Sequence, residues 1–395
     1  VSQAIEYLKG NNQNIINHLG ENRADYENSV VPPIYQSSIF CFDSVDDLRQ
    51  NLKRELEVPF YTRGVNPTVT TLRRKIAALE KTEDALIFGS GSGAIAAAVM
   101  NSVQAGDHVV CVQKPYSWTG KLLGNYLSKY KVEVSFIDGK SIDNFENAIQ
   151  PNTKLFYLET PNSVTFELQD LRAVAELAKK KGIRTICDNS YSSPIYQNPS
   201  EYGIDIVCHS ASKYIGGHSD VVAGILCASS EVVNSIFANE FMTIGSIISP
   251  NDAWLLLRGL RTLPMRIKQS HETTVKVIDW LSSHPKVEKI NYPFLESFPQ
   301  LELAKKQMRG CGGLFSMEIN ANSIEEIETF CNSLNHFLIA CSWGGYESLL
   351  FPTCALFDSA NYNQTALSWK LIRFYIGFED HQIIIDDFSQ AFNKI

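Results

Sequence analysis

The chain has 395 residues and a formal net charge of -8 at pH 7. An acidic chain without a run of Lys and Arg excludes a general nucleic-acid binder, because a phosphate backbone needs a basic patch. Hydrophobic residues make up 44% and charged residues 20%, which is an ordinary globular composition. No stretch approaches the roughly 20 apolar residues that span a bilayer. The N-terminal segment is polar and lacks a signal-peptide core, so we expect a cytoplasmic protein.

Nine cysteines are present, and their number and spacing bear on the redox compartment. No two of them have a CxxC spacing, and several lie within apolar runs, as in TICDN and HVVCVQ. This pattern favours buried free thiols in a reducing cytoplasm over disulfides or a zinc site. The cysteines are residues 41, 111, 187, 208, 227, 311, 331, 341 and 354.

In chain order, residues 1–57 are predicted to form an irregular arm with helical pieces. Within the arm, the paired prolines of VVPPIYQSS (30–38) predict an extended segment. An amphipathic helix is predicted over 70–82, and another over 168–182, which ends in Lys and Gly as helices often do. Short β-rich apolar runs alternate with helical segments as far as about residue 249. These runs are 107–113, 132–138, 153–160, 183–189, 204–210 and 222–229.

Strands that alternate with helices predict an α/β domain with a mostly parallel sheet, here over 58–249. The pattern changes beyond Pro250. Residues 251–284 predict one long helix or two, followed by a strand at 312–319 and a helix at 323–334. Strands and helices without strict alternation predict a smaller α+β domain over 250–395.

A glycine-rich turn, Gly89-Ser90-Gly91-Ser92-Gly93, follows the apolar run ALIF and precedes a helical segment. Free backbone N–H groups and the helix dipole make such a turn an anion site, and a phosphate fits there. The turn also matches the dinucleotide fingerprint GxGxxA, but Gln113 and Lys114 stand where that fingerprint needs an acidic residue. A plain tight turn is the simpler alternative.

Three further residues carry candidate chemistry. Asp188 closes the run 183–189, where its carboxylate can pair with a protonated pyridine nitrogen. Lys213 follows the run 204–210, and a partly desolvated lysine forms an imine with an aldehyde. Tyr116, just past 107–113, can stack on an aromatic ring. Taken singly, each has a simpler interpretation: a helix N-cap or surface residue for Asp188, a solvated side chain for Lys213, and a core or loop aromatic for Tyr116.

The segment Ser210-Ala211-Ser212 is read as extended, which places both hydroxyls on one side. The glycines 216 and 217 allow the backbone to pass close to a ligand. Together with the glycine turn, Asp188 and Tyr116, these residues supply the parts of a pyridoxal phosphate site around Lys213.

At this point the chain resembles the Cys/Met-metabolism family of pyridoxal-phosphate enzymes, from about Val30 to the end. The motifs that carry the resemblance are YTRGVNPT (61–68), SGSGAIAA (90–97), DNSYSSP (188–194) and HSASKYIGGHSDVVAG (209–224). The resemblance implies the aspartate aminotransferase-like fold of PLP-dependent transferases, with a mostly parallel seven-stranded sheet. It also implies pyridoxal 5'-phosphate as the cofactor and a homotetramer built from catalytic dimers, in which residues 1–57 contact a neighbouring subunit.

The resemblance also assigns roles to individual residues. Lys213 is implied as the Schiff-base lysine and as a catalytic residue with Tyr116, which stacks on the ring, while Asp188 pairs with the ring nitrogen. The other implied cofactor contacts are the backbone of Gly91 and Ser92, the hydroxyls of Ser210 and Ser212, and Tyr61 and Arg63 reaching into a neighbouring subunit. The implied substrate-binding residues are Arg373, Ser342, Trp343 and Ser163.

Within the family, two strings are similar to bacterial cystathionine β-lyases. ETPNSVTFELQD (159–170) lacks the Asn-Pro pair common in the γ-synthases, and SWGGYESL (342–349) has Trp343 where the γ-enzymes usually have Leu. Cys341 departs from both groups, since the γ-enzymes usually carry Glu there and the bacterial β-lyases Tyr. The motif YTRGVNPT matches the broad family better than the β-lyases.

The expected activity is α,β-elimination of L-cystathionine to homocysteine, pyruvate and ammonia, in methionine metabolism. The alternatives are a cystathionine γ-synthase or O-acylhomoserine sulfhydrylase, a cystathionine or methionine γ-lyase, and a binding protein that keeps the cofactor without turnover.

Overall fold

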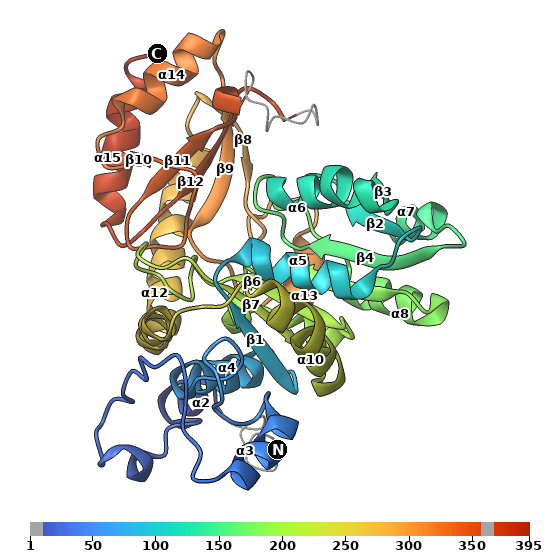
Figure 1. Cartoon of the computed structure of the whole chain (residues 1–395). Coiled ribbons are helices and arrows are strands. Elements are labelled where there is room, and N and C mark those ends of the chain that lie inside the picture. Colours follow the sequence, from blue (N-terminus) through green and yellow to red (C-terminus); the bar gives the residue numbers. More distant parts are fainter. Residues whose placement is uncertain (1–10, 357–366) are drawn as a thin grey trace.

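The computed structural model describes residues 11–356 and 367–395. Its centre is a seven-stranded sheet with strand order β1-β7-β6-β5-β4-β2-β3 (Figure 1). Four of the six neighbouring strand pairs are parallel, and β7 runs antiparallel to both of its neighbours. The strands are β1 Asp84–Phe88, β2 His108–Val112, β3 Glu133–Ile137, β4 Thr153–Glu159, β5 Arg184–Asp188, β6 Ile206–Ser210 and β7 Gly224–Ala228.

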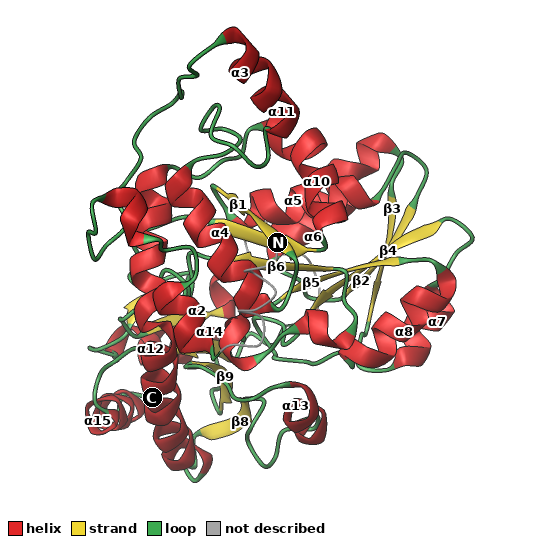
Figure 2. Ribbon diagram, turned by 90° about the horizontal axis from the view of Figure 1, so that it is seen from below, coloured by secondary structure: helices red, strands yellow, loops and turns green. Residues whose placement is uncertain are grey.

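Helices cover both faces of this sheet (Figure 2). Apolar side chains alternate between the two faces, so that Ile186 and Cys187 of β5 belong to different hydrophobic cores. One face packs against α4 Pro67–Glu80, α7 Ile142–Ala148 and α8 Leu171–Lys181. The other packs against α5 Gly91–Ser102, η3 Leu122–Tyr126 and α10 Ser230–Ile236. Shorter elements of this region are α6 Ser117–Lys121, η4 Leu127–Tyr130, α9 Ser193–Tyr196, η5 Pro199–Tyr202, η6 Phe237–Phe241 and α11 Met242–Ile244.

The C-terminal part contains a second, five-stranded sheet with order β10-β11-β12-β9-β8. Only the β10–β11 pair is parallel. The strands are β8 Val287–Asn291, β9 Leu314–Ile319, β10 Leu338–Ile339, β11 Leu349–Pro352 and β12 Leu371–Tyr375. The helices are α12 Pro250–Ser282, α13 Leu301–Gln307, α14 Ile324–Ser333, α15 His381–Phe392 and the 3₁₀ turn η7 Thr353–Leu356. Figure 1 shows this sheet beside the larger one, and Arg373 on β12 donates to the Ser163 carbonyl in the loop that follows β4.

The N-terminal arm lies apart from the two sheets (Figure 1). From residue 11 it holds four short elements: α2 Asn12–His18, η1 Arg23–Tyr26, α3 Val45–Asn51 and η2 Leu52–Arg54. The buried amine of Lys75 anchors α2 to α4 by donating to the carbonyls of Ile15 (3.2 Å) and Ile16 (2.8 Å) and pairing with Glu21 (3.1 Å). Residues 1–10 of the predicted arm lie outside the described residues.

The predicted fold class is confirmed, including a mostly parallel seven-stranded sheet and a smaller second sheet. Residues 250–282 form a single helix that continues through Pro264. The first predicted helix begins at Pro67, three residues earlier than expected, because the Asn66 side chain caps it by accepting from the Thr68 N–H. The domain boundaries at 57 and 249 stay predictions. In the described parts of the chain, no helix has the length and apolar character needed to cross a membrane.

Candidate active site

The glycine turn forms the start of α5. The Ser90 hydroxyl caps the helix by accepting from the Gly93 N–H at 3.0 Å. The N–H groups at a helix start have no partner within the helix, so those of Gly91 and Ser92 can face an anion. The turn is pressed against the ends of two strands: a Cβ on Gly91 would lie 3.0 Å from Cα of Ser210, and one on Gly224 would lie 2.0 Å from the Ser90 carbonyl oxygen.

This close packing makes Gly224 a sensitive position. Replacing it with Ala is expected to lower the free energy of unfolding by about 1–3 kcal/mol. The new methyl group would overlap the Ser90 backbone, which cannot shift without displacing the start of α5. Gly120→Ala is the matched control, since its Cβ would meet only Pro115 Cγ, at 3.8 Å. Urea denaturation of both variants checks the prediction. Equal stability of the two would contradict it.

Lys213 lies in a turn that follows β6. Its Nζ donates to the Ser342 hydroxyl at 2.6 Å and lies 5.6 Å from the centre of the Trp343 ring. Burial, helped by the nearby Arg373 guanidinium, lowers the pKa of Lys213 to about 8. More of this amine is therefore neutral at pH 7 than in a solvated lysine, and the neutral amine is the form that attacks an aldehyde.

The expectation that Ser210 to Ser212 forms an extended segment is wrong. The strand ends at Ser210, and residues 211–216 form turns in which the Gly216 N–H donates to the Ala211 carbonyl at 2.8 Å. The Ser212 hydroxyl accepts from the Ala223 N–H at 3.0 Å. Ser210 still lies beside the α5 start, because it is the residue that a Cβ on Gly91 would touch.

Asp188 ends β5 and is buried. One carboxylate oxygen accepts from the Ser190 N–H (2.9 Å) and the Ser190 hydroxyl (2.6 Å). Burial raises the pKa of Asp188, whereas these hydrogen bonds and the charges of His209 and Lys213 oppose the rise. None of the described cationic side chains forms an ion pair with Asp188, so a protonated ring nitrogen would supply the missing positive partner.

Tyr116 directly precedes α6, and the residue is 41% exposed. Burial raises the pKa of its hydroxyl, which also interacts with Ser92. Its backbone N–H donates to Glu159 Oε2 at 2.6 Å. Tyr116 therefore stands between the α5 start and the end of β4.

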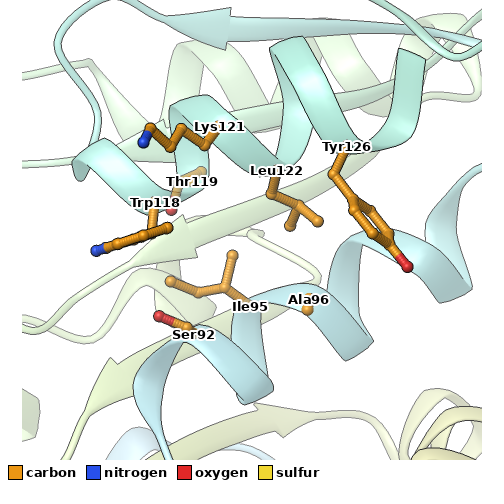
Figure 3. Close-up of a pocket in the computed structure, with 8 residues that line it drawn as sticks. All are labelled: Ser92, Ile95, Ala96, Trp118, Thr119, Lys121, Leu122 and Tyr126. Carbon is orange, nitrogen blue, oxygen red and sulfur yellow. The ribbon is translucent and has the colours of Figure 1, made fainter. Parts of the chain in front are cut away.

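A cavity of about 290 Å³ adjoins Ser92 and lies between α5 and the α6–η3 segment (Figure 3). Its lining is mostly apolar, and Figure 3 shows Ile95 and Leu122 facing one another across it. The lining residues are Ser92, Ile95, Ala96, Trp118, Thr119, Lys121, Leu122 and Tyr126.

Arg373, on β12, reaches toward the same region from the second sheet. Its guanidinium donates to the backbone carbonyls of Ser163 (3.1 Å) and Cys341 (2.9 Å). Burial lowers its pKa to about 10, so Arg373 keeps its charge at neutral pH. Among the described residues no carboxylate pairs with it, which leaves its charge available for a substrate carboxylate.

Most of the predicted site residues thus come together from both sheets around Lys213. Tyr61 and Arg63 do not. They stack on each other, with the Arg63 Cζ 5.5 Å from the Tyr61 ring centre, and no described hydrogen bond joins them to the other site residues. Sequence reasoning missed Glu159, although it ends β4 in the same way as Asp188 ends β5, and the two are register partners.

The site fits pyridoxal phosphate on three observations: open N–H groups at the α5 start, a lysine with a lowered pKa, and a buried carboxylate without a cation. The fold and this group of residues define an enzyme of the α/β class that uses pyridoxal phosphate.

The comparisons then give the family: the chain belongs to the Cys/Met metabolism PLP-dependent enzymes, whose model matches residues 13–393. It is 36% identical over 385 residues to an L-methionine γ-lyase of Treponema denticola, with 96% of each chain covered. It is 37% identical to a cystathionine γ-lyase of Bacillus subtilis, covering 85% of this chain and 89% of the relative. The crystal structure of metB from Corynebacterium glutamicum matches with a TM-score of 0.92 at 33% identity, covering 98% of this chain and 99% of that one.

Proposed function

We propose that this enzyme is a carbon–sulfur lyase that cleaves L-cystathionine by α,β-elimination, releasing homocysteine, pyruvate and ammonia. The observation that carries the proposal is Trp343. Its indole is buried, packs edge-on against Tyr214 with ring centres 5.3 Å apart, and lies beside the Lys213 amine. The two enzymes named above are γ-lyases. The proposal differs from them in the bond that is cleaved, which is Cβ–S in β-elimination and Cγ–S in γ-elimination.

The proposed roles follow from charge and position. Arg373 binds the substrate carboxylate, aided by Ser342 and the Trp343 backbone, with Ser163 beside it. Pyridoxal phosphate, when bound, supplies an aldehyde for amines and a ring that takes up the electron pair left at Cα. Asp188 holds a proton on the ring nitrogen. Lys213 or Tyr116 removes the α-proton, and Lys213 donates a proton to the departing sulfur.

Trp343 favours β-elimination because it limits the movement of Lys213. In β-elimination the leaving sulfur is bonded to Cβ, the carbon next to Cα. The Lys213 amine then has to reach only the α-proton and that sulfur. In γ-elimination the amine must also take a proton from Cβ and serve a sulfur one carbon farther away. The bond to Ser342 and the rigid indole restrict that longer movement.

The deciding experiment is to incubate the enzyme with L-cystathionine and identify the keto acid. We expect pyruvate, and Trp343→Leu is expected to raise the ratio of 2-oxobutyrate to pyruvate several-fold by releasing Lys213. If the unaltered enzyme produces 2-oxobutyrate, it is a γ-lyase and the β-elimination proposal is wrong. Parallel assays with O-acylhomoserine and a thiol detect a γ-replacement enzyme.

We further propose a homotetramer of catalytic dimers, in which the arm of one subunit contacts its neighbour. Two features support it. Tyr61 is 43% exposed, and no described hydrogen bond joins the side chain of Tyr61 or Arg63 to the site residues of the same chain. The cavity beside Ser92 is the proposed place where they approach the phosphate of a neighbouring subunit. A reducing cytoplasm is the proposed location, because all nine cysteines are free thiols and seven are buried.

A further inference from the structure

Glu159 is a buried acid with no role in the scheme above. It is the last residue of β4, lies opposite Asp188 of β5 in the sheet register, and is 4% exposed. Among the described residues no Lys, Arg or His forms an ion pair with it. A buried carboxylate without a cation is costly unless hydrogen bonds hold it, so the identity of its donors matters.

Three donors converge on this carboxylate. Oε2 accepts from the Tyr116 N–H at 2.6 Å, while Oε1 accepts from the Ser163 N–H at 2.9 Å and the Ser163 hydroxyl at 2.7 Å. Ser163 in turn offers its carbonyl to Arg373 at 3.1 Å. One side chain thus links the residue before α6, the loop after β4 and the guanidinium on β12.

We propose that Glu159 is a positioning residue whose ionised carboxylate fixes Tyr116 and Ser163, and through Ser163 the arginine that binds the substrate carboxylate. Protonation removes the negative charge that the two N–H groups face and turns one oxygen into an O–H donor. The bonds from the Tyr116 and Ser163 N–H groups therefore weaken, and the Ser163 hydroxyl must reverse its direction to keep its contact. The loop carrying Ser163 then loosens, and Arg373 loses one of its two carbonyl partners. The link to substrate rests on the proposed function, whereas the ionisation of Glu159 does not.

The charges around Glu159 set the pH at which this change occurs. Burial and then the Asp188 carboxylate raise its pKa to about 7, against the three hydrogen bonds. The other titratable groups that feel the charge of Glu159 are the Arg373 guanidinium, the Tyr116 and Tyr157 hydroxyls and the Cys111 thiol. The ionised form of Glu159 is the form that holds the Ser163 loop in place. Amino-acid binding should therefore weaken as the pH falls through neutrality and Glu159 becomes protonated.

The first test is infrared difference spectroscopy of the full-length holoenzyme between about pH 6 and 8, around the pKa of about 7. We expect a protonated-carboxyl band that grows as the pH falls and is absent from Glu159→Gln. Glu201→Gln, a matched change at an exposed acid, should keep the band. A band that persists unchanged in Glu159→Gln would overturn the proposal.

The second test is the binding of glycine, a non-eliminating amino acid, to the holoenzyme, followed by cofactor absorbance. The unaltered enzyme should bind glycine more weakly at the acid end, while Glu159→Gln should bind about tenfold more weakly at alkaline pH and lose this pH dependence. Unchanged binding in the variant would overturn the proposal. Because glycine carries no leaving group, this result is independent of whether the enzyme cleaves cystathionine.

Ser163→Ala provides the same test if Glu159→Gln does not fold. It removes one hydroxyl donor to the carboxylate, and that hydrogen bond favours the ionised form. Both the infrared transition and the glycine-binding transition should therefore move to higher pH. A shift to lower pH, or no shift, would contradict the proposed role of Glu159.

Discussion

Replacing Lys213 with Ala is expected to lower the rate of cystathionine cleavage by at least about 1000-fold, since one residue is proposed both to hold the cofactor covalently and to transfer protons. Tyr116 can take over only the removal of the α-proton, and the two polar side chains described beside the amine cannot replace it. Ser342 is the hydrogen-bond acceptor of this amine, and Arg373 stays protonated at neutral pH because its pKa is about 10.

The experiment should measure the covalent attachment of the cofactor separately from the rate of cystathionine cleavage. After dialysis and borohydride reduction, mass spectrometry should find pyridoxal phosphate fixed to the unaltered chain and absent from Lys213→Ala. Lys268→Ala, at an exposed residue of α12 that forms an ion pair with Glu272 at 3.7 Å, is the control and should keep both the label and the activity. Cleavage at the full rate by Lys213→Ala would disprove the proposed role of the lysine.

Much of the fold was predictable because local sequence and tertiary environment agree. The six β-rich runs all form strands, since each is short, apolar and bounded by polar or glycine residues. The errors arose at the ends of helices and strands, where a single side chain can determine the residue at which the element begins or stops. Asn66 caps α4 and moves its start to Pro67, and this Asn-Pro pair stands in the sequence just before the predicted helix.

The site was predictable only in part. Asp188 and Lys213 were found because Asp188 ends one strand and Lys213 closely follows another, at the carboxyl ends that meet at the active site. The same rule applied to β4 would have singled out Glu159. Its importance, however, depends on Ser163 and Arg373, which are 210 residues apart and are joined only by folding. No local pattern encodes that contact, nor the turn that redirects the chain after Ser210.

Arg373→Ala is expected to lower kcat/KM for cystathionine by about 100-fold or more, mostly through KM, as removing one partner of a desolvated charge pair costs roughly 2–5 kcal/mol. Arg373→Lys should recover only part of this loss. The planar guanidinium can donate to two carbonyls and to a substrate carboxylate at once, whereas the lysine ammonium has fewer donors and a more flexible side chain. Thermal melting is the control, since Ala leaves the Ser163 and Cys341 carbonyls without their donor.

The pH dependence of KM distinguishes this arginine from Glu159. With a pKa of about 10, Arg373 stays charged across the neutral range, so its own ionisation cannot change KM there. The pKa of Glu159 is about 7, so the part of a rise in KM at falling pH that is absent from Glu159→Gln reports the carboxylate that orders the Ser163 loop. In Arg373→Ala this rise should largely disappear, because the loop then has no guanidinium to position. A full-sized rise in that variant would show that Glu159 acts on binding by a route that bypasses Arg373.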